Sequence, residues 1–203
     1  MKCIIVGAGD FYPGAFSKSD GDYIIAADGG YDYLININCT PDTVIGDFDS
    51  RDGIPNHPHV IKLNKIKDDT DMIAAVNLGI ERGYREFHIH GATGGRLDHT
   101  LANIQTIAYL SKQHCSAYIY GDNYVITALT DGTITFDNTY SGIMSIFAHD
   151  TTVSGVTLTG LKYPLNDVEL TNTFPLGVSN EFIGMETTVT VRNGTLIIIY
   201  KRV

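Results

Sequence analysis

The feature that most constrains the fold of this chain is the alternation of short apolar runs with helical hydrophobic patterns over residues 1–120. The apolar runs predict β-strands at residues 3–6, 23–27, 43–45, 60–63, 87–90 and 117–120. Apolar residues three or four apart predict two amphipathic helices, one around Met72, Val76 and Ile80 and one around Leu97, Leu101, Ile104 and Ala108. Strands that alternate with helices favour a mainly parallel sheet covered by helices.

The pattern changes between residues 120 and 128, where Thr, Val, Ile and Tyr begin to gather in short runs at residues 133–136, 143–147, 187–192 and 195–200. We therefore expect an α/β domain over residues 1–122 and a β-rich domain over residues 123–203. Within the second domain, Asn193-Gly194 predicts a two-residue hairpin turn between Arg192 and Thr195, because this dipeptide tolerates positive φ.

Composition limits the partners of the chain. Its formal charge is −9, with 14 Lys and Arg against 23 Asp and Glu, so it lacks the basic clusters that bind a nucleic-acid backbone. No segment approaches the roughly 20 apolar residues of a membrane span, so we expect no membrane partner and a cytoplasmic location. Cys3, Cys39 and Cys115 show no CxxC spacing, which favours reduced thiols over a disulfide framework or a zinc site.

Aspartates carry the clearest chemical signal, because they follow predicted strands. Asp28 follows the second strand, Asp47 and Asp49 follow the third, and residues 68–71 hold three more acids. Ligands of open α/β sheets bind at the carboxyl ends of the strands. Alternation along an extended segment points Asp47 and Asp49 the same way, so with Asp71 they could share one hard cation such as Mg²⁺.

Each acidic cluster has a plainer interpretation. Asp68 and Asp71 are spaced as an N-terminal capping arrangement for the following helix. Asp47 and Asp49 could simply form a turn, although two like charges held together cost free energy unless a cation compensates them.

Residues 91–99 form a glycine-rich segment that leads from a predicted strand into a predicted helix. Backbone N–H groups at such a helix start can receive phosphate, and Arg96 adds a cation that can fork onto two oxygens. Asp98 is placed to hold a substrate hydroxyl or amine. The alternative is an ordinary strand–turn–helix connection with an exposed arginine.

The glycines near the start fit neither standard nucleotide fingerprint. Gly7 and Gly9 do not complete GxGxxG, and no GxxxxGK[ST] loop is present. The two glycines therefore either form a tight turn or let the backbone approach a phosphate.

The histidines favour structural roles over metal binding. His88, His90 and His99 are expected to satisfy local hydrogen bonds. His57 and His59 have no accompanying Cys or His cluster, so we expect a solvated loop there.

In their order along the chain, the motifs resemble those of the thiamine pyrophosphokinase family. No single motif is specific to that family, but the set of motifs in this order is specific. The motifs span nearly the whole chain and lie at residues 27–30, 46–50, 68–71, 91–99, 160–165 and 177–181.

The resemblance implies a Rossmann-like N-terminal α/β domain that binds ATP, a C-terminal all-β sandwich that binds thiamine, and a homodimer with the active site where subunits meet. It implies transfer of a pyrophosphoryl group from ATP to thiamine. The implied Mg²⁺ ligands are Asp47, Asp49 and Asp71, with Asp49, Asp71, Arg96 and Asp98 as catalytic residues. The implied nucleotide contacts are Asp28, Lys67, Asp68, Thr70, Gly94, Gly95 and Arg96, and the implied thiamine contacts are Asp98, Ser179 and Asn180.

The chain departs from some relatives in having no tryptophan, and Tyr163 stands where several have one. Tyr163, Phe174 or Phe182 could stack on the acceptor, or could simply belong to a β-sandwich core. Two rival functions stay open at this point: pyrophosphoryl transfer to another alcohol such as a hydroxymethylpterin, and a non-catalytic nucleotide or thiamine sensor.

Overall fold

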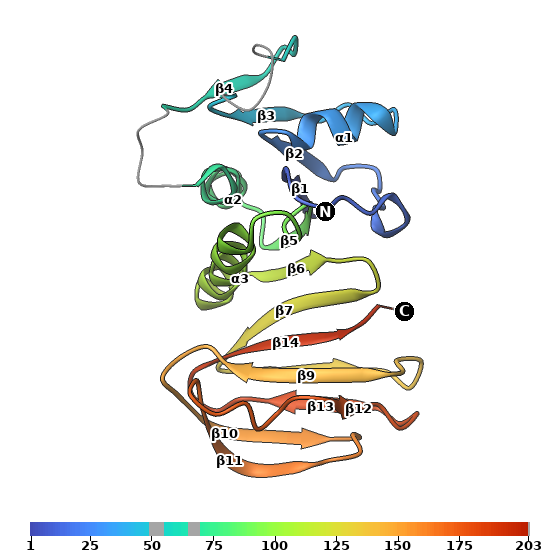
Figure 1. Cartoon of the computed structure of the whole chain (residues 1–203), viewed down its shortest axis with the longest axis vertical. Coiled ribbons are helices and arrows are strands. Elements are labelled where there is room, and N and C mark those ends of the chain that lie inside the picture. The colour runs from blue at the N-terminus through green and yellow to red at the C-terminus, as the bar shows by residue number, and fades with distance from the viewer. Residues whose placement is uncertain (49–54, 65–69, 203) are drawn as a thin grey trace. The chain divides into compact units, whose positions relative to one another are not determined.

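The computed structural model describes residues 1–48, 55–64 and 70–202 (Figure 1). The chain divides into two compact units, one made of Met1–Thr106 with Ala117–Asp122 and the other of Ile107–Ser116 with Asn123–Val203. The expected functional division between residues 122 and 123 stays a prediction.

The strands of the first unit form a largely parallel sheet. They are β1 (Cys3–Val6), β2 (Tyr23–Ala27), β3 (Thr43–Gly46), β4 (Val60–Lys62), β5 (Glu86–His90) and β6 (Ser116–Tyr120). Their spatial order is β6-β5-β1-β2-β3-β4. β1 pairs in parallel with β2 and β5, and the pairs β2–β3 and β3–β4 are parallel as well. The strand predictions for this unit are confirmed, with ends shifted by at most one residue.

Helices cover both faces of this sheet. The helices described are α1 (Gly30–Asn36), α2 (Asp71–Glu81) and α3 (Leu97–Lys112), with a 3-10 turn η1 (Pro13–Ala15) after β1. Leu34 of α1 packs with Ile4 and Val6 of β1, whereas Gly79 of α2 lies against Cys3. Because side chains alternate along a strand, α1 and α2 cover opposite faces. α1 was not among the helices predicted from the apolar pattern.

The buried face of α3 differs from the predicted one. Leu97 and Leu101 are 72% and 56% exposed. The buried positions are instead Asn103, Thr106, Ile107, Ala108 and Leu110. Two polar side chains occupy this face because each finds a hydrogen-bond acceptor: Asn103 donates to Ala92 O and Thr106 donates to Ala102 O. The predicted apolar stripe was therefore wrong at Leu97 and Leu101.

The second unit carries two sets of antiparallel strands that belong to different sheets. Its strands are β7 (Tyr124–Thr130), β8 (Thr133–Phe136), β9 (Ile143–Ala148), β10 (Thr152–Thr159), β11 (Leu165–Thr171), β12 (Asn180–Glu181), β13 (Thr187–Thr190) and β14 (Thr195–Lys201). One set is ordered β12-β9-β14-β7 and the other β11-β10-β13-β8. Phe136 of β8 meets Tyr200 of β14 with ring centroids 4.9 Å apart, so aromatic side chains pack between the sheets in a sandwich-like arrangement.

The predicted hairpin at Asn193-Gly194 is wrong. β13 pairs with β8 and β10, whereas β14 pairs with β7 and β9, so the chain changes sheets here instead of turning back. Gly194 does adopt the expected positive φ, 109°, and its N–H donates to Asp131 Oδ1 at 2.7 Å. Dipeptide chemistry predicted the local turn but not the partner of the strand that follows it.

Two expectations from composition can be compared with the structure. Cys3, Cys39 and Cys115 are buried thiols, and burial raises the pKa of Cys3 to about 12. Within the described ranges, no helix combines the length and hydropathy needed to cross a bilayer.

Candidate active site

The carboxyl ends of the central parallel strands lie at one edge of the first unit. Val6 of β1 is in register with Ala26 of β2 and with His90 of β5, and Ala27 is in register with Ile45 of β3. The segments that follow these strands therefore emerge side by side. Such an edge is where open α/β sheets bind ligands.

Asp28 and Asp47 lie on adjacent segments of this edge. Asp28 has φ 49°, and its N–H donates to Ile45 O at 2.9 Å. A methyl group at Gly46 would come within 3.2 Å of Asp28 Cα, so the two backbones are in close contact. Phe48 also has positive φ, 58°, and is only 5% exposed, which anchors the turn that carries Asp47. Two carboxylates thus share one short stretch of the edge.

Helix α2 begins with a threonine cap. Thr70 is the N-cap residue, and its Oγ1 accepts a hydrogen bond from Ile73 N at 3.2 Å. Asp71 is the first helical residue, where the helix dipole favours a carboxylate. The N-cap position is thus held by Thr70, and the part of the alternative capping arrangement that falls on Asp68 lies outside the described residues.

Three predicted site residues, Asp49, Lys67 and Asp68, lie outside the described residues. Among the residues that are described, no group of three or more His, Cys, Asp or Glu side chains could hold a metal ion. Since Asp49 belongs to the predicted metal set, that set stays a proposal.

The glycine-rich turn after β5 is tied to the segment after β1. Gly9 N donates to Gly91 O at 2.8 Å, and Asp10 N donates to Thr93 O at 2.7 Å. A methyl group at Gly9 would lie 2.5 Å from Thr93 O, closer than real contacts allow. The early glycines therefore let two backbone segments touch each other, which explains Gly7 and Gly9 without a phosphate.

Gly94 and Gly95 form the exposed tip of this turn, with φ 80° and 57°. A methyl group at Gly94 would overlap the Asp10 carboxylate, whereas one at Gly95 would meet nothing within 4 Å. Asp10 is a candidate site residue that the sequence motifs did not point to. Asp10 lies four residues past the end of β1, whereas Asp28 and Asp47 directly follow their strands, so the sequence held no comparable signal for it.

Arg96 and Asp98 form a two-point ion pair at the start of α3. Arg96 donates from Nε to Oδ1 at 3.1 Å and from Nη2 to Oδ2 at 2.6 Å, and both side chains are exposed. The Arg96 guanidinium lowers the pKa of Asp98 to about 2, and Asp98 in turn raises the pKa of Arg96. Asp98 is therefore a carboxylate at neutral pH and a weak base.

The histidines on β5 have structural partners, as predicted. His88 lies 2.8 Å from Tyr120 Oη through Nδ1 and 2.9 Å from Glu86 Oε1 through Nε2. Burial lowers the pKa of His88. His90 is 2% exposed, and its ring stacks on Tyr120 with centroids 4.7 Å apart.

His57 also has local partners, since its Nε2 lies 2.9 Å from Pro41 O and its Nδ1 lies 3.2 Å from His59 O. His99 is exposed.

In the second unit, Asn180 ties two segments together. Its Oδ1 accepts from Tyr163 N at 3.0 Å and Glu181 N at 2.9 Å, and its Nδ2 donates to Tyr163 O at 2.7 Å. Asn180 is 5% exposed, whereas the Tyr163 side chain is 58% exposed. The amide therefore fixes the backbone that presents an exposed aromatic ring. Ser179 precedes it with φ 60°, and its N–H donates to Ser145 Oγ at 3.0 Å.

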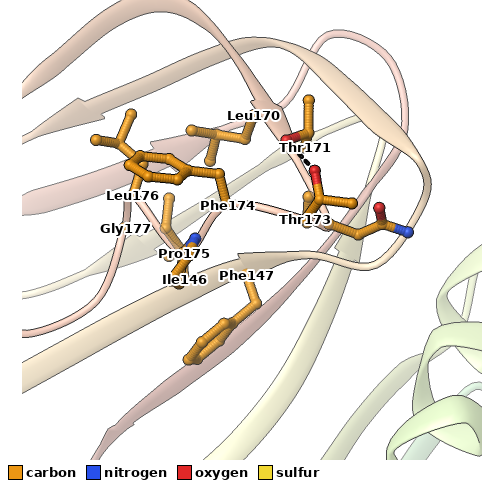
Figure 2. A pocket seen from close by; sticks show the side chains of 11 residues that line it. Ile146, Phe147, Leu170, Thr171, Thr173, Phe174, Pro175, Leu176 and Gly177 are labelled. Atoms are coloured by element: carbon orange, nitrogen blue, oxygen red, sulfur yellow. Dashed lines mark hydrogen bonds between the residues drawn. The ribbon is translucent and has the colours of Figure 1, made fainter.

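The other two aromatic candidates differ from each other. Phe182 is 6% exposed and packs against Phe136, so it belongs to the core. Phe174 is 66% exposed and lines a pocket of about 250 Å³ between β9 and the segment after β11 (Figure 2). Figure 2 shows the Phe174 ring beside Leu176, with the hydroxyls of Thr171 and Thr173 3.3 Å apart.

Comparison with known protein families identifies both units. Residues 17–119 match the family model described as the thiamin pyrophosphokinase catalytic domain, and residues 131–197 match the thiamin pyrophosphokinase vitamin B1 binding domain. The chain belongs to the thiamin pyrophosphokinase family. The resemblance noted in the sequence is thereby confirmed.

Individual relatives agree with this assignment. The chain is 30% identical over 182 residues to the thiamine pyrophosphokinase of Bacillus subtilis, which covers 86% of this chain and 85% of the relative. The crystal structure of thiamine pyrophosphokinase from Bacillus subtilis superposes with a TM-score of 0.87 at 28% identity, covering 100% of both chains. That of the thiamin pyrophosphokinase from Geobacillus thermodenitrificans gives 0.86 at 30% identity, covering 100% of this chain and 98% of the other.

The family matches separate the site residues into two groups. The region matched to the family's catalytic domain contains the edge carboxylates, the glycine-rich turn and the Arg96–Asp98 pair. The region matched to the vitamin B1 binding domain contains Tyr163, Ser179 and Asn180. Asp10 precedes the first matched region, so its place beside Gly94 is visible only in the structure.

Proposed function

We propose that the chain transfers a pyrophosphoryl group from ATP to the hydroxyl of thiamine, forming thiamine diphosphate and AMP. In a chain of this family, the observation that carries the proposal is the arrangement at the sheet edge. There the Gly94-Gly95 turn and Arg96, which suit phosphate, share the carboxyl edge of the sheet with Asp28 and Asp47, which suit a hard cation. A Rossmann-like nucleotide-binding role for the first unit is part of this proposal.

The carboxylates proposed as ligands suit Mg²⁺, and the structure describes two of them, Asp47 and Asp71. Carboxylate oxygens on neighbouring segments are hard ligands, which Mg²⁺ prefers, and the ion also keeps waters and bridges substrate phosphates. Asp47, Asp49 and Asp71 would hold it. When bound, Mg²⁺ would neutralise negative charge on the phosphate oxygens.

On the nucleotide side, the protein's own groups act by positioning and by charge. Arg96 would donate to the phosphates through the same fork that it now directs at Asp98. The Gly94 and Gly95 amides would donate to oxygens whose charge grows as AMP departs. Asp28, Lys67, Asp68 and Thr70 are proposed to line the rest of the nucleotide.

On the acceptor side, the thiamine hydroxyl oxygen attacks the β-phosphorus. The bond from that phosphorus to the oxygen that stays on AMP breaks, and the hydroxyl proton passes to solvent. With a pKa of about 2, Asp98 would orient the hydroxyl and not act as a strong base. Phosphoryl chemistry depends mainly on positioning and electrostatics, so a strong base is not required. Ser179, Asn180 and the exposed ring of Tyr163 are the proposed acceptor contacts of the second unit.

We further propose a homodimer with the active site where the subunits meet. Several apolar side chains of the second unit are exposed by 43 to 58%, which is typical of a surface that another protein covers: Ile143, Val178, Ile183 and Met185. Sedimentation at micromolar concentration tests this, and a monomer would contradict it. A cytoplasmic location also stays a proposal.

The assay that tests the function measures AMP release from ATP and Mg²⁺ with thiamine, with a hydroxymethylpterin, and with no acceptor. AMP that depends on thiamine supports the proposal. AMP formed only with the pterin would overturn the acceptor but keep the edge chemistry. No AMP with either acceptor, together with retained ligand binding, would support a sensor instead.

A further inference from the structure

The glycine-rich turn after β5 is held from one side by the segment after β1. His90 O, Gly91 O and Thr93 O accept hydrogen bonds from Gly7 N, Gly9 N and Asp10 N at 2.8, 2.8 and 2.7 Å. Of the four consecutive carbonyls from His90 to Thr93, only that of Ala92 takes no part in these three hydrogen bonds. It accepts a hydrogen bond from a different partner.

Asn103 supplies that partner from α3. Its Nδ2 donates to Ala92 O at 2.7 Å, across eleven residues of sequence, and Asn103 is only 8% exposed. Ala92 itself is 2% exposed, so this hydrogen bond is buried at both ends. An apolar residue of similar size would fill the same space without donating. Nothing in the sequence pattern marks Asn103 as more than a polar residue of a helix.

The hydrogen bond from Asn103 to Ala92 O also restrains the residues that follow Ala92 in the turn. The carbonyl of Ala92 and the N–H of Thr93 belong to one planar trans peptide, so fixing one fixes the other. The next two residues, Gly94 and Gly95, have positive φ and no side chains to limit their freedom. Their orientation therefore depends on how firmly the two peptides before them are held: Asp10 N holds the Thr93–Gly94 peptide through Thr93 O, and Asn103 holds the Ala92–Thr93 peptide through Ala92 O.

We propose that Asn103 is a positioning residue that orients the glycine-rich turn for the phosphates of the nucleotide. This inference rests on the proposed function, because it assigns the turn to phosphate. Asn103 acts through the backbone of Ala92 and does not touch the substrate.

The test compares Asn103→Leu and Asn103→Asp with wild type. Asn103→Leu keeps the size but removes the donor, and we expect kcat/KM for ATP to fall on the order of 100-fold, the scale of a small misplacement of catalytic groups. KM for thiamine should stay within about twofold, on the same argument from positioning. Gln105→Leu, which removes an exposed amide two residues along the same helix, is the matched control and should leave both values unchanged.

Asn103→Asp adds a readout that a purely structural role would not move. The carboxyl introduced there can donate to Ala92 O only when protonated, and burial favours the protonated form. Activity relative to wild type should therefore rise as pH falls for Asn103→Asp and stay flat for Asn103→Leu. Division by the wild-type value removes the pH dependence that both proteins share.

Direct binding of Mg²⁺-ATP by calorimetry separates this inference from the proposed function. Weaker ATP binding by both variants, with Asn103→Asp recovering at low pH, supports the positioning role even if wild type fails to use thiamine. Lower melting temperatures with wild-type ATP affinity and wild-type kcat/KM would overturn it, since Asn103 would then be structural only.

Discussion

Arg96 donates to both carboxylate oxygens of Asp98, two residues further along the chain, through Nε at 3.1 Å and Nη2 at 2.6 Å. The fork that fits a phosphate is thus directed at the carboxylate proposed to orient the acceptor. A phosphate that binds Arg96 must compete with Asp98, and success in that competition frees Asp98 for the acceptor. Nucleotide and acceptor binding should accordingly favour each other.

Arg96→Ala removes both the proposed donor to phosphate and the partner of Asp98. We expect kcat to fall roughly 10² to 10³-fold, the scale for losing one preorganised donor to developing charge. The pKa of Asp98 should rise from about 2 toward the ordinary aspartate value, because the hydrogen bonds from Arg96 that lower it most are lost. Steady-state kinetics and a carboxyl NMR titration measure the two effects.

The control for this prediction is Arg85→Ala, at an exposed arginine that donates a hydrogen bond to Tyr84 O. Unchanged turnover in Arg96→Ala would show that Arg96 does not bind the phosphates.

Gly94→Ala and Gly95→Ala form a matched pair. Both residues have positive φ, which costs a non-glycine residue about 1–2 kcal/mol. Only Gly94 also faces the Asp10 carboxylate, so Gly94→Ala should lose more stability and more activity than Gly95→Ala. Adding Asp10→Ala to Gly94→Ala should restore part of the lost stability. Equal free energies of unfolding for the two single variants would contradict the packing of Gly94 against Asp10.

Asn180→Ala should act on the acceptor and not on the nucleotide. It removes the hydrogen bonds that hold both backbone groups of Tyr163. We expect KM for thiamine to rise about tenfold, equivalent to about 1.4 kcal/mol, with KM for ATP unchanged. Loss of these partly buried bonds should also lower the free energy of unfolding by about 1–3 kcal/mol. Asn166→Ala, at an exposed asparagine of β11, is the control. A selective rise in KM for ATP would count against this assignment.

His88 should make stability depend on pH. Burial lowers the pKa of His88 below its ordinary 6.5, so the unfolded chain takes up a proton at a higher pH than the folded one. The contribution of the neutral imidazole is therefore present above about pH 6.5 and is lost as pH falls through the lower folded pKa. Denaturant midpoints should drop less on acidification in His88→Gln than in wild type. Identical pH profiles would show that His88 does not titrate abnormally.

The sequence was sufficient for the parallel sheet but not for every element around it. β1 and β2 are buried on both faces, so they read as continuous apolar runs with clear ends. α1 was missed because only Gly30 and Leu34 are buried in it, which leaves no repeating stripe. The face of α3 was misassigned because hydrogen bonding, which a hydrophobicity pattern does not contain, buries Asn103 and Thr106.

The candidate site likewise contains residues that the sequence predicts and residues that only the structure reveals. Arg96 and Asp98 could be identified from local motif chemistry, because residue type and spacing carry their roles. Asp10 and Asn103 could not, since each acts on the glycine-rich turn through a contact between segments distant in sequence. Family resemblance was needed for Ser179 and Asn180, whose residue types alone say little.

The central claim is pyrophosphoryl transfer to thiamine, and the most direct measurement follows a label on the γ-phosphate of ATP. We expect thiamine diphosphate that carries the label, with unlabelled AMP formed in equal amount, because attack at the β-phosphorus moves both outer phosphates together. Labelled thiamine monophosphate with ADP would show attack at the γ-phosphorus and would contradict the account.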